Sequence, residues 1–272
     1  MKEITDKEFR TIRDYIKQNF GIALSDEKKS LIYSRLRTTL LDNGFTNFTD
    51  YFDHLISDKT GDAIVRFIDK VTTNHTYFMR ESDHFYYLRD TALPFIKEKW
   101  GADRDLRLWC AASSSGEEPT TLAIIAHDFF KNEPAKWDTT ILATDISSQI
   151  LDKAVFGVYA NEAIEPMPAE WKKNYFKPYD NNHSVVTDEI KKKILYRKFN
   201  LMSPRFSFKK KLHIIFCRNV MIYFDNKTRD EIVQKFYDII EPEGFLFIGH
   251  SESLNHTGTA FKYVMPALYR KI

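Results

Sequence analysis

Residues 106–130 read LRLWCAASSSGEEPTTLAIIAHDFF, and this stretch decides the fold class. The apolar run at 106–111 is typical of a buried strand, and residues 117–130 carry apolar side chains at helical spacing. A turn of small residues joins the two segments. The same strand–turn–helix order returns at 139–156 and at 213–240. Strands that alternate with helices predict an α/β fold with a parallel, doubly wound sheet, in which ligands bind at the carboxyl ends of the strands.

The first 90 residues follow a different pattern, which predicts a small all-helical N-terminal domain with a linker helix. The first helix is expected to end at Gly21. The second is expected to be capped by Ser25 and to end at Asn43 and Gly44. The side chains it is expected to turn inward are Leu31, Ile32, Leu36, Leu40 and Leu41. Two shorter helices are expected to complete this domain, at residues 48–55 and 63–71.

The α/β pattern fills the rest of the chain, so we expect a second domain over residues 91–272. A polar stretch at about 159–200 breaks the alternation of strands and helices. We interpret it as an inserted subdomain of short strands, which include residues 184–186 and 194–196. The chain is expected to close with an antiparallel hairpin, formed by residues 261–264 and 267–272.

Composition excludes several classes of protein. The 272 residues include 40 Lys and Arg against 38 Asp and Glu, and a net charge of +2 gives no argument for binding nucleic acid. No apolar run approaches the ~20 residues of a membrane span, and the N-terminus lacks the apolar region of a secretory signal. These features predict a cytoplasmic protein that does not insert into membranes.

Metal and hydrolase chemistry are not expected either. The two cysteines, Cys110 and Cys217, lie in apolar runs far apart, and the eight histidines show no metal-ligand spacing. No G-x-S-x-G string marks a nucleophilic serine. We therefore expect no metal in the functional site.

The turn after the first strand argues for an adenosine cofactor without phosphates. It holds a single glycine, Gly116, and opens the next helix with Glu117 and Glu118, whereas a pyrophosphate favours several glycines and no added negative charge. Small residues beside an acid suit S-adenosylmethionine, although the two carboxylates would also suit the helix N-terminus alone. Asp145 ends the second strand, where an acid accepts hydrogen bonds from a ribose or caps the next helix. Together, the turn and Asp145 favour the adenosine interpretation.

Five strings in order resemble the CheR family, the chemotaxis receptor glutamate methyltransferases, over essentially the whole chain. They are TTNHTYFMRE at 72–81, LRLWCAASSSGEEP at 106–119, ATDI at 143–146, FCRNVMIYFD at 216–225 and GHSES at 249–253. The resemblance implies a Rossmann-like class I methyltransferase domain after the helical domain, with a small antiparallel β-subdomain inserted. It also implies methyl transfer from S-adenosylmethionine to glutamate side chains of chemoreceptor signalling domains, giving methyl esters and leaving S-adenosylhomocysteine.

The resemblance further implies roles for individual residues. The family's cofactor contacts fall on Asn74, Thr76, Arg80, Glu117, Asp145, Asn200, Leu201, Arg218 and Asn219. The arginine and tyrosine proposed near the transferred methyl group fall on Arg80 and Tyr223. A carboxylate nucleophile is already charged at neutral pH, so the site needs alignment and exclusion of water rather than a strong base.

The expected partner is the cytoplasmic helical bundle of a chemoreceptor, and we expect the enzyme to act as a monomer. The second expected helix carries basic residues that suit glutamate-bearing helices or simply face solvent, namely Lys28, Lys29, Arg35 and Arg37. Two other functions stay open at this point. One is a silent module that binds S-adenosylmethionine as a sensor ligand, which would not need both Arg80 and Tyr223. The other is methylation of a small carboxylic acid, which would not need the basic helix.

Overall fold

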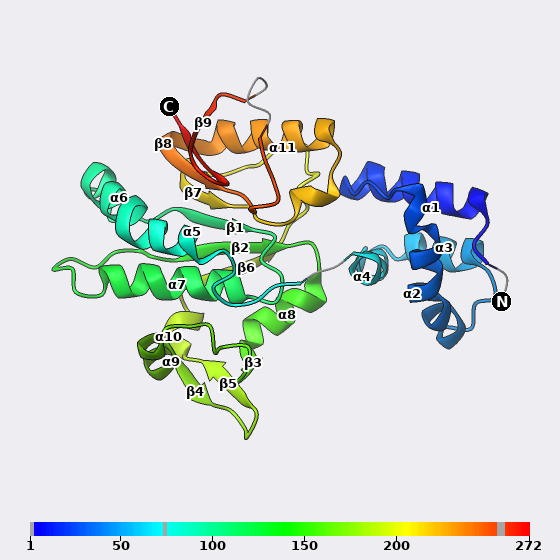
Figure 1. Ribbon diagram of the computed structural model, residues 1–272, viewed down its shortest axis with the longest axis horizontal. Coiled ribbons are helices and arrows are strands. Elements are labelled where there is room, and N and C mark those ends of the chain that lie inside the picture. Colours follow the sequence, from blue (N-terminus) through cyan, green and yellow to red (C-terminus); the bar gives the residue numbers. More distant parts are fainter. Residues whose placement is uncertain (1–2, 73–74, 255–258) are drawn as a thin grey trace.

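The computed structural model describes residues 3–72, 75–254 and 259–272. Its helical domain lies at one end of the molecule, beside the carboxyl ends of the strands of the α/β domain (Figure 1). The domain is built from four α-helices and one short 3₁₀ turn: α1 (Asp6–Phe20), η1 (Asp26–Lys28), α2 (Lys29–Asp42), α3 (Phe48–Ser57) and α4 (Asp62–Val71).

Helices α1 and α2 end near Gly21 and Gly44 as the sequence predicts. The prediction that Ser25 caps the second helix is wrong, because Ser25 precedes η1, its side chain forms no capping hydrogen bond, and α2 begins at Lys29. Thr5 and Glu8 form a capping box at the start of α1, and Gly21 ends the helix in the left-handed conformation. The inward face of α2 carries residues at four-residue spacing (Ile32, Leu36 and Leu40), all fully buried. The expectation that Leu31 and Leu41 point inward is wrong, because each lies one position away from this stripe and is exposed.

The α/β domain is organised around a seven-stranded mixed sheet in the order β6-β2-β1-β7-β8-β10-β9. The first five strands in this order, β6, β2, β1, β7 and β8, are parallel to one another. The β9–β10 hairpin adds the antiparallel edge that the sequence predicts. The strand bounds are β1 (Leu108–Ala111), β2 (Ile141–Asp145), β6 (Ile194–Lys198), β7 (Leu212–Phe216), β8 (Ile240–Phe247), β9 (Phe261–Met265) and β10 (Leu268–Lys271).

Alternating side chains of the strands build a core on each face of this sheet. Leu108 and Cys110 of β1 pack in the core on one face of the sheet, whereas Trp109 and Ala111 pack in the core on the opposite face. The first face is covered by α5 (Ser82–Tyr87), η2 (Leu88–Ala92), α6 (Leu93–Trp100) and α7 (Glu117–Phe130). The other is covered by α11 (Asn226–Ile239), as Figure 1 shows.

The insert forms a separate three-stranded antiparallel sheet in the order β3-β5-β4, below the main sheet in Figure 1. It follows α8 (Ser148–Phe156) and contains β3 (Val158–Ala160), α9 (Ala169–Tyr175), β4 (Phe176–Pro178), β5 (His183–Val186) and α10 (Asp188–Lys191). Residues 184–186 belong to it, as predicted. The interpretation of residues 194–196 is wrong: they lie in β6, which pairs in parallel with β2 and extends the main sheet.

The predicted fold class is confirmed: an all-helical domain precedes a Rossmann-like domain that carries a small antiparallel sheet. Within the described ranges, we find no helix with both the length and the apolar character needed to cross a membrane.

Candidate active site

A cavity of about 310 Å³ opens where β1, β2 and β7 end. Such a volume is in the range of small-molecule sites, and this edge is where doubly wound sheets bind ligands. Its floor comes from the residues that follow these strands. Its opposite wall comes from the helical domain, through Phe20, Ile22, Ile68, Asp69 and Thr72. The cavity therefore lies between the two domains, which the sequence did not predict.

The turn after β1 brings its backbone close to the cavity. Ala112, Ser114 and Gly116 all adopt positive φ angles, of 73°, 47° and 98°. Only glycine fits at position 116, because a Cβ there would lie 2.7 Å from the hydroxyl of Tyr159 and 2.9 Å from Ala154 Cβ. Glycine is thus required at position 116 by both backbone conformation and space.

Asp145 lies at the cavity wall at the end of β2. Its carboxylate accepts hydrogen bonds from the backbone N–H of Ser114 at 2.9 Å and of Ser147 at 3.0 Å. Burial raises the pKa of Asp145, these N–H donors oppose the rise, and the neighbouring Asp69 adds to it. Ser147 also donates to Asp69 at 2.6 Å, so this serine links two acids that line the cavity.

The two acids that open α7 have different environments. Glu117 is 8% exposed and accepts from the Ser115 hydroxyl, and burial raises its pKa. It lies beside the cavity rather than among the described residues that line it. Glu118 does line the cavity, and its carboxylate accepts from Arg218 Nη1 at 2.7 Å. The sequence assigned no separate role to Glu118.

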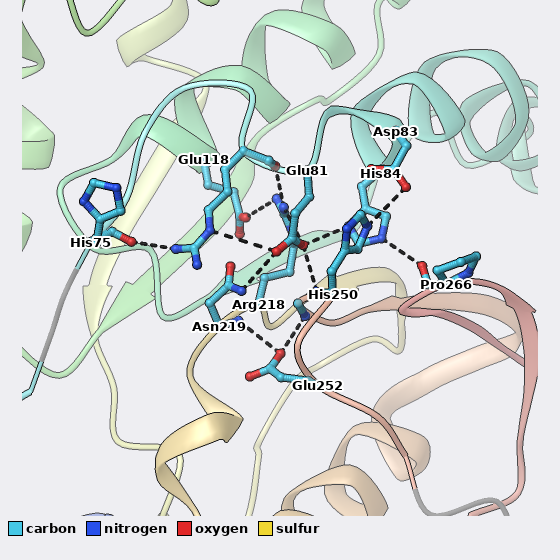
Figure 2. A network of polar contacts seen from close by, with 12 residues as sticks. His75, Glu81, Asp83, His84, Glu118, Arg218, Asn219, His250, Glu252 and Pro266 are labelled. Atoms are coloured by element: carbon cyan, nitrogen blue, oxygen red, sulfur yellow. Dashed lines mark hydrogen bonds and ion pairs between the residues drawn. The ribbon is translucent and has the colours of Figure 1, made fainter.

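Arg218 is held in a buried network centred on Glu81 (Figure 2). Its side chain is 1% exposed and donates to Glu81 at 2.9 Å, to Glu118 and to the backbone oxygen of Arg80. Glu81 also accepts from Asn219 Nδ2 at 3.1 Å and from the backbone N–H of His250 at 3.1 Å. Burial acts to raise the pKa of Glu81, but Arg218 and Asn219 outweigh it and hold this pKa below its usual value.

One part of this network resembles a metal site in composition. Glu81, His84 and His250 each bring a ligand-type atom within 4.8 Å of the others. However, Glu81 Oε2, the oxygen nearer His84, already accepts three hydrogen bonds from Arg218 and His250, and Oε1 accepts one from Asn219. The cluster is better explained as the hydrogen-bonded support of Arg218 and Asn219.

The structure brings most of the predicted site residues together. Those that line the cavity are Thr76, Arg80, Asp145, Asn200, Leu201, Arg218, Asn219 and Tyr223. Asn74 lies outside the described residues. Arg80 Nη1 donates to the backbone oxygen of His75 at 2.6 Å, and Asn200 Nδ2 donates to the backbone oxygen of Asn19 at 2.9 Å. Tyr223 belongs to the short helix η3 (Met221–Tyr223) and packs against the core of the helical domain.

Comparison with known proteins decides the family. Residues 7–72 match "CheR methyltransferase, all-alpha domain", and residues 74–268 match "CheR methyltransferase, SAM binding domain". The chain belongs to the CheR methyltransferase family. It is 40% identical to the chemotaxis protein methyltransferase of Borreliella burgdorferi over 98% of this chain and 95% of that one. The same-named protein of Escherichia coli is 34% identical over 95% and 88%, and chemotaxis protein methyltransferase 2 of Pseudomonas aeruginosa is 35% identical over 97% and 93%.

This CheR protein is therefore a methyltransferase that uses S-adenosylmethionine. The residues at the cavity fit that cofactor. Ser113 lines the cavity and is 1% exposed. Its Oγ has no hydrogen-bond partner among the described residues. Acids at the wall suit the cationic end and the ribose of the cofactor, and arginines suit its carboxylate.

The basic residues predicted to meet the receptor fall into two pairs. Lys29 Nζ lies 2.5 Å from Asp6, and Arg35 Nη1 lies 3.3 Å from the backbone oxygens of residues 70, 71 and 72, at the C-terminus of α4. Lys28 and Arg37 form no ion pair within the described part of the chain, and Arg37 is exposed. Lys29 and Arg35 therefore have structural partners in the helical domain.

Proposed function

We propose that this enzyme methylates glutamate side chains in the signalling domain of a chemoreceptor, acting in the cytoplasm as a monomer. The observation that supports this most is the cavity itself, where Asp145, Arg80 and Tyr223 line one space that the helical domain closes. Membership of a chemotaxis methyltransferase family supports the choice of receptor. We also keep residues 1–90 and 91–272 as the proposed division into domains.

The proposed roles follow from the chemistry of each group. Asp145 accepts hydrogen bonds from the ribose of the cofactor, in a binding region shared with Asn74, Thr76, Glu117, Asn200, Leu201, Arg218 and Asn219. The bound cofactor supplies an electrophilic methyl group, which a carboxylate oxygen of the substrate takes by displacement. Arg80 orients a carboxylate at the wall, because a guanidinium matches it with two parallel N–H donors. Tyr223 places one carboxylate oxygen through its hydroxyl.

The mouth of the cavity suits a protein substrate. Tyr77 and Ile222 line the cavity and are 44% and 50% exposed, so they present apolar surface around its entrance. A receptor helix would cover this surface while one of its glutamates enters. Lys28 and Arg37 on the helical domain are then the cations proposed to meet acidic positions of the receptor, since Lys29 and Arg35 have partners in the chain.

The proposal is tested by transfer of a labelled methyl group from S-adenosylmethionine to a purified receptor cytoplasmic fragment, followed by mild alkali. Label that enters the fragment and leaves as methanol identifies a carboxyl methyl ester. A fragment with its candidate glutamates changed to alanine is the control and should stay unlabelled. If a panel of receptors receives no label while calorimetry shows that the cofactor binds, the chain is a binding module and the proposal fails.

A further inference from the structure

Glu252 is a buried acid that is not among the described residues lining the cavity. It lies in the loop after β8 and is 8% exposed. Its carboxylate accepts backbone N–H groups from two loops: Asn219 at 3.0 Å, Ile222 at 3.1 Å and Gly249 at 2.5 Å. Figure 2 shows it beneath Asn219, on the side away from Glu81. A carboxylate held in this way organises a backbone rather than a ligand.

The loop that Glu252 contacts has few other ways to satisfy its backbone. Residues 217–220 connect β7 to η3 and belong to no strand or α-helix. Asn219 adopts a φ angle of +57°, which is uncommon for a residue with a side chain. Buried N–H groups outside regular structure need a partner, and Glu252 supplies one for Asn219 and one for Ile222.

This loop also forms a large part of the cavity wall. Six residues from it and its continuation line the cavity: Arg218, Asn219, Val220, Ile222, Tyr223 and Phe224. Its far end is fixed by the helical domain, because the backbone N–H of Ala23 donates to the Tyr223 oxygen at 2.7 Å. Its near end is fixed by Glu81, which accepts from the Asn219 side chain. Glu252 supports the part between these two anchors.

The loop bearing Glu252 is packed tightly against the cavity loop. A Cβ at residue 249 would lie 2.3 Å from Asn219 Nδ2 and 2.9 Å from its backbone nitrogen, so glycine is required there. Gly249 and Glu252 therefore act on Asn219 together, one by leaving space and one by accepting its N–H. A change at position 249 acts directly on Asn219, and a change at position 252 acts directly on both Asn219 and Ile222.

We propose that Glu252 is a positioning residue of the methyl-transfer site, whose carboxylate fixes residues 218–223 so that Asn219 and Tyr223 stay at the cavity wall. The inference rests on the proposed placement of these two residues in the site. It assigns Glu252 no contact with cofactor or substrate. Its effect passes through the backbone of the loop.

The test compares Glu252→Gln with the wild-type enzyme. Glutamine keeps one acceptor oxygen and replaces the other with an NH₂ group that faces N–H donors, so the loop loses a charged hydrogen bond. We expect the Kd for S-adenosylhomocysteine, measured by calorimetry, to rise about 10- to 100-fold. We also expect kcat to fall by a larger factor than the KM for the receptor fragment rises, because among the described residues of the proposed receptor surface Glu252 contacts only the backbone of Ile222.

Two further variants make the result decisive. Ile96→Val removes a methyl group from the buried face of α6 without touching the cavity, so it controls for a general loss of stability. Gly249→Ala displaces the Asn219 side chain while leaving the Glu252 carboxylate in place, so it should reproduce the loss of affinity. It decides the matter if Glu252→Gln does not fold.

The inference is overturned if folded Glu252→Gln has the wild-type Kd, or if Ile96→Val loses affinity to the same extent. With Glu252→Gln unfolded, a folded Gly249→Ala with wild-type constants overturns it instead. The binding measurement needs no receptor. A wild-type enzyme that transfers no methyl group would therefore refute the proposed function and leave the comparison of Kd values standing.

Discussion

Glu117 and Glu118 are adjacent in sequence, yet we expect replacement by glutamine to destabilise the protein at Glu118 and not at Glu117. Both lie in the first turn of α7, so both carboxylates gain similarly from the helix N-terminus. Glu118 pairs with Arg218, whose side chain is 1% exposed. Glu117 accepts from Ser115 and has no cation within ion-pair distance among the described residues. The comparison of the two variants therefore isolates the buried ion pair.

The magnitude for Glu118→Gln follows from this geometry. Removing one partner of a buried pair outright costs about 3–5 kcal/mol. Two features reduce this cost: Glu81 still neutralises Arg218, and the glutamine oxygen still accepts a hydrogen bond from Nη1. We expect a loss of about 1.5–3 kcal/mol in the free energy of unfolding, which is typical of a charged hydrogen bond.

Glu117→Gln is expected to leave the free energy of unfolding unchanged or to increase it at neutral pH. Burial raises the pKa of Glu117, so the ionised group opposes folding there. As the pH falls through the raised pKa, the wild-type carboxylate takes up a proton and this penalty disappears. The difference between Glu117→Gln and the wild type should therefore shrink in acid.

Equilibrium unfolding in urea, followed by circular dichroism at pH 7 and again in acid, measures both effects. Equal slopes with urea concentration show that the variants differ in stability and not in the extent of unfolding. The reasoning is refuted if Glu118→Gln is as stable as the wild type, or if Glu117→Gln is the more damaging of the two.

Three further predictions concern the site and the receptor surface. Asp145→Ala should weaken binding of S-adenosylhomocysteine by about 1–3 kcal/mol, because a charged hydrogen bond is lost, and an unchanged affinity in calorimetry would remove Asp145 from the site. Tyr223→Phe should lower turnover more than cofactor affinity, because only the hydroxyl is removed; wild-type turnover would leave Tyr223 a packing role. Arg37→Met should raise the KM for the receptor fragment at unchanged melting temperature, whereas Arg35→Met should lower that temperature, because Arg35 binds the carbonyl oxygens that end α4. Identical effects of the two changes would contradict this division.

The parts of the site that are local in sequence could be predicted from it. Asp145 and the turn before Gly116 follow buried strands, and the carboxyl ends of parallel strands meet at one edge of the sheet. Hydrophobic periodicity likewise identified α1 to α4, α7, α8, α11 and most strands of the main sheet, but not α6, α9 or α10. It failed at residues 194–196, because a short apolar run pairs equally well in a small sheet or at the edge of a large one.

The parts that depend on distant contacts could not be predicted. Glu81, Glu118 and Glu252 all lie within the strings that resemble the family, but nothing local shows that they bind residues 100 or more positions away or a neighbouring loop. The available signal was that these strings contain carboxylates to which the sequence analysis assigned no role. The contribution of the helical domain to the cavity depends on how two domains pack, which residue spacing within either domain does not encode.

The position of the cavity connects the two tasks that the enzyme must perform. Helix α4 contributes Ile68 and Asp69 to the cavity wall, and Arg35 of the basic helix α2 holds the C-terminus of α4. The helix proposed to meet the receptor therefore contacts α4, which forms one wall of the proposed cofactor site. On the other side, Lys17 of α1 pairs with Asp225, which caps α11 directly after the loop bearing Tyr223. A helical domain that served only to hold the receptor would need neither connection, so we infer that it also completes the site in which the methyl group is transferred.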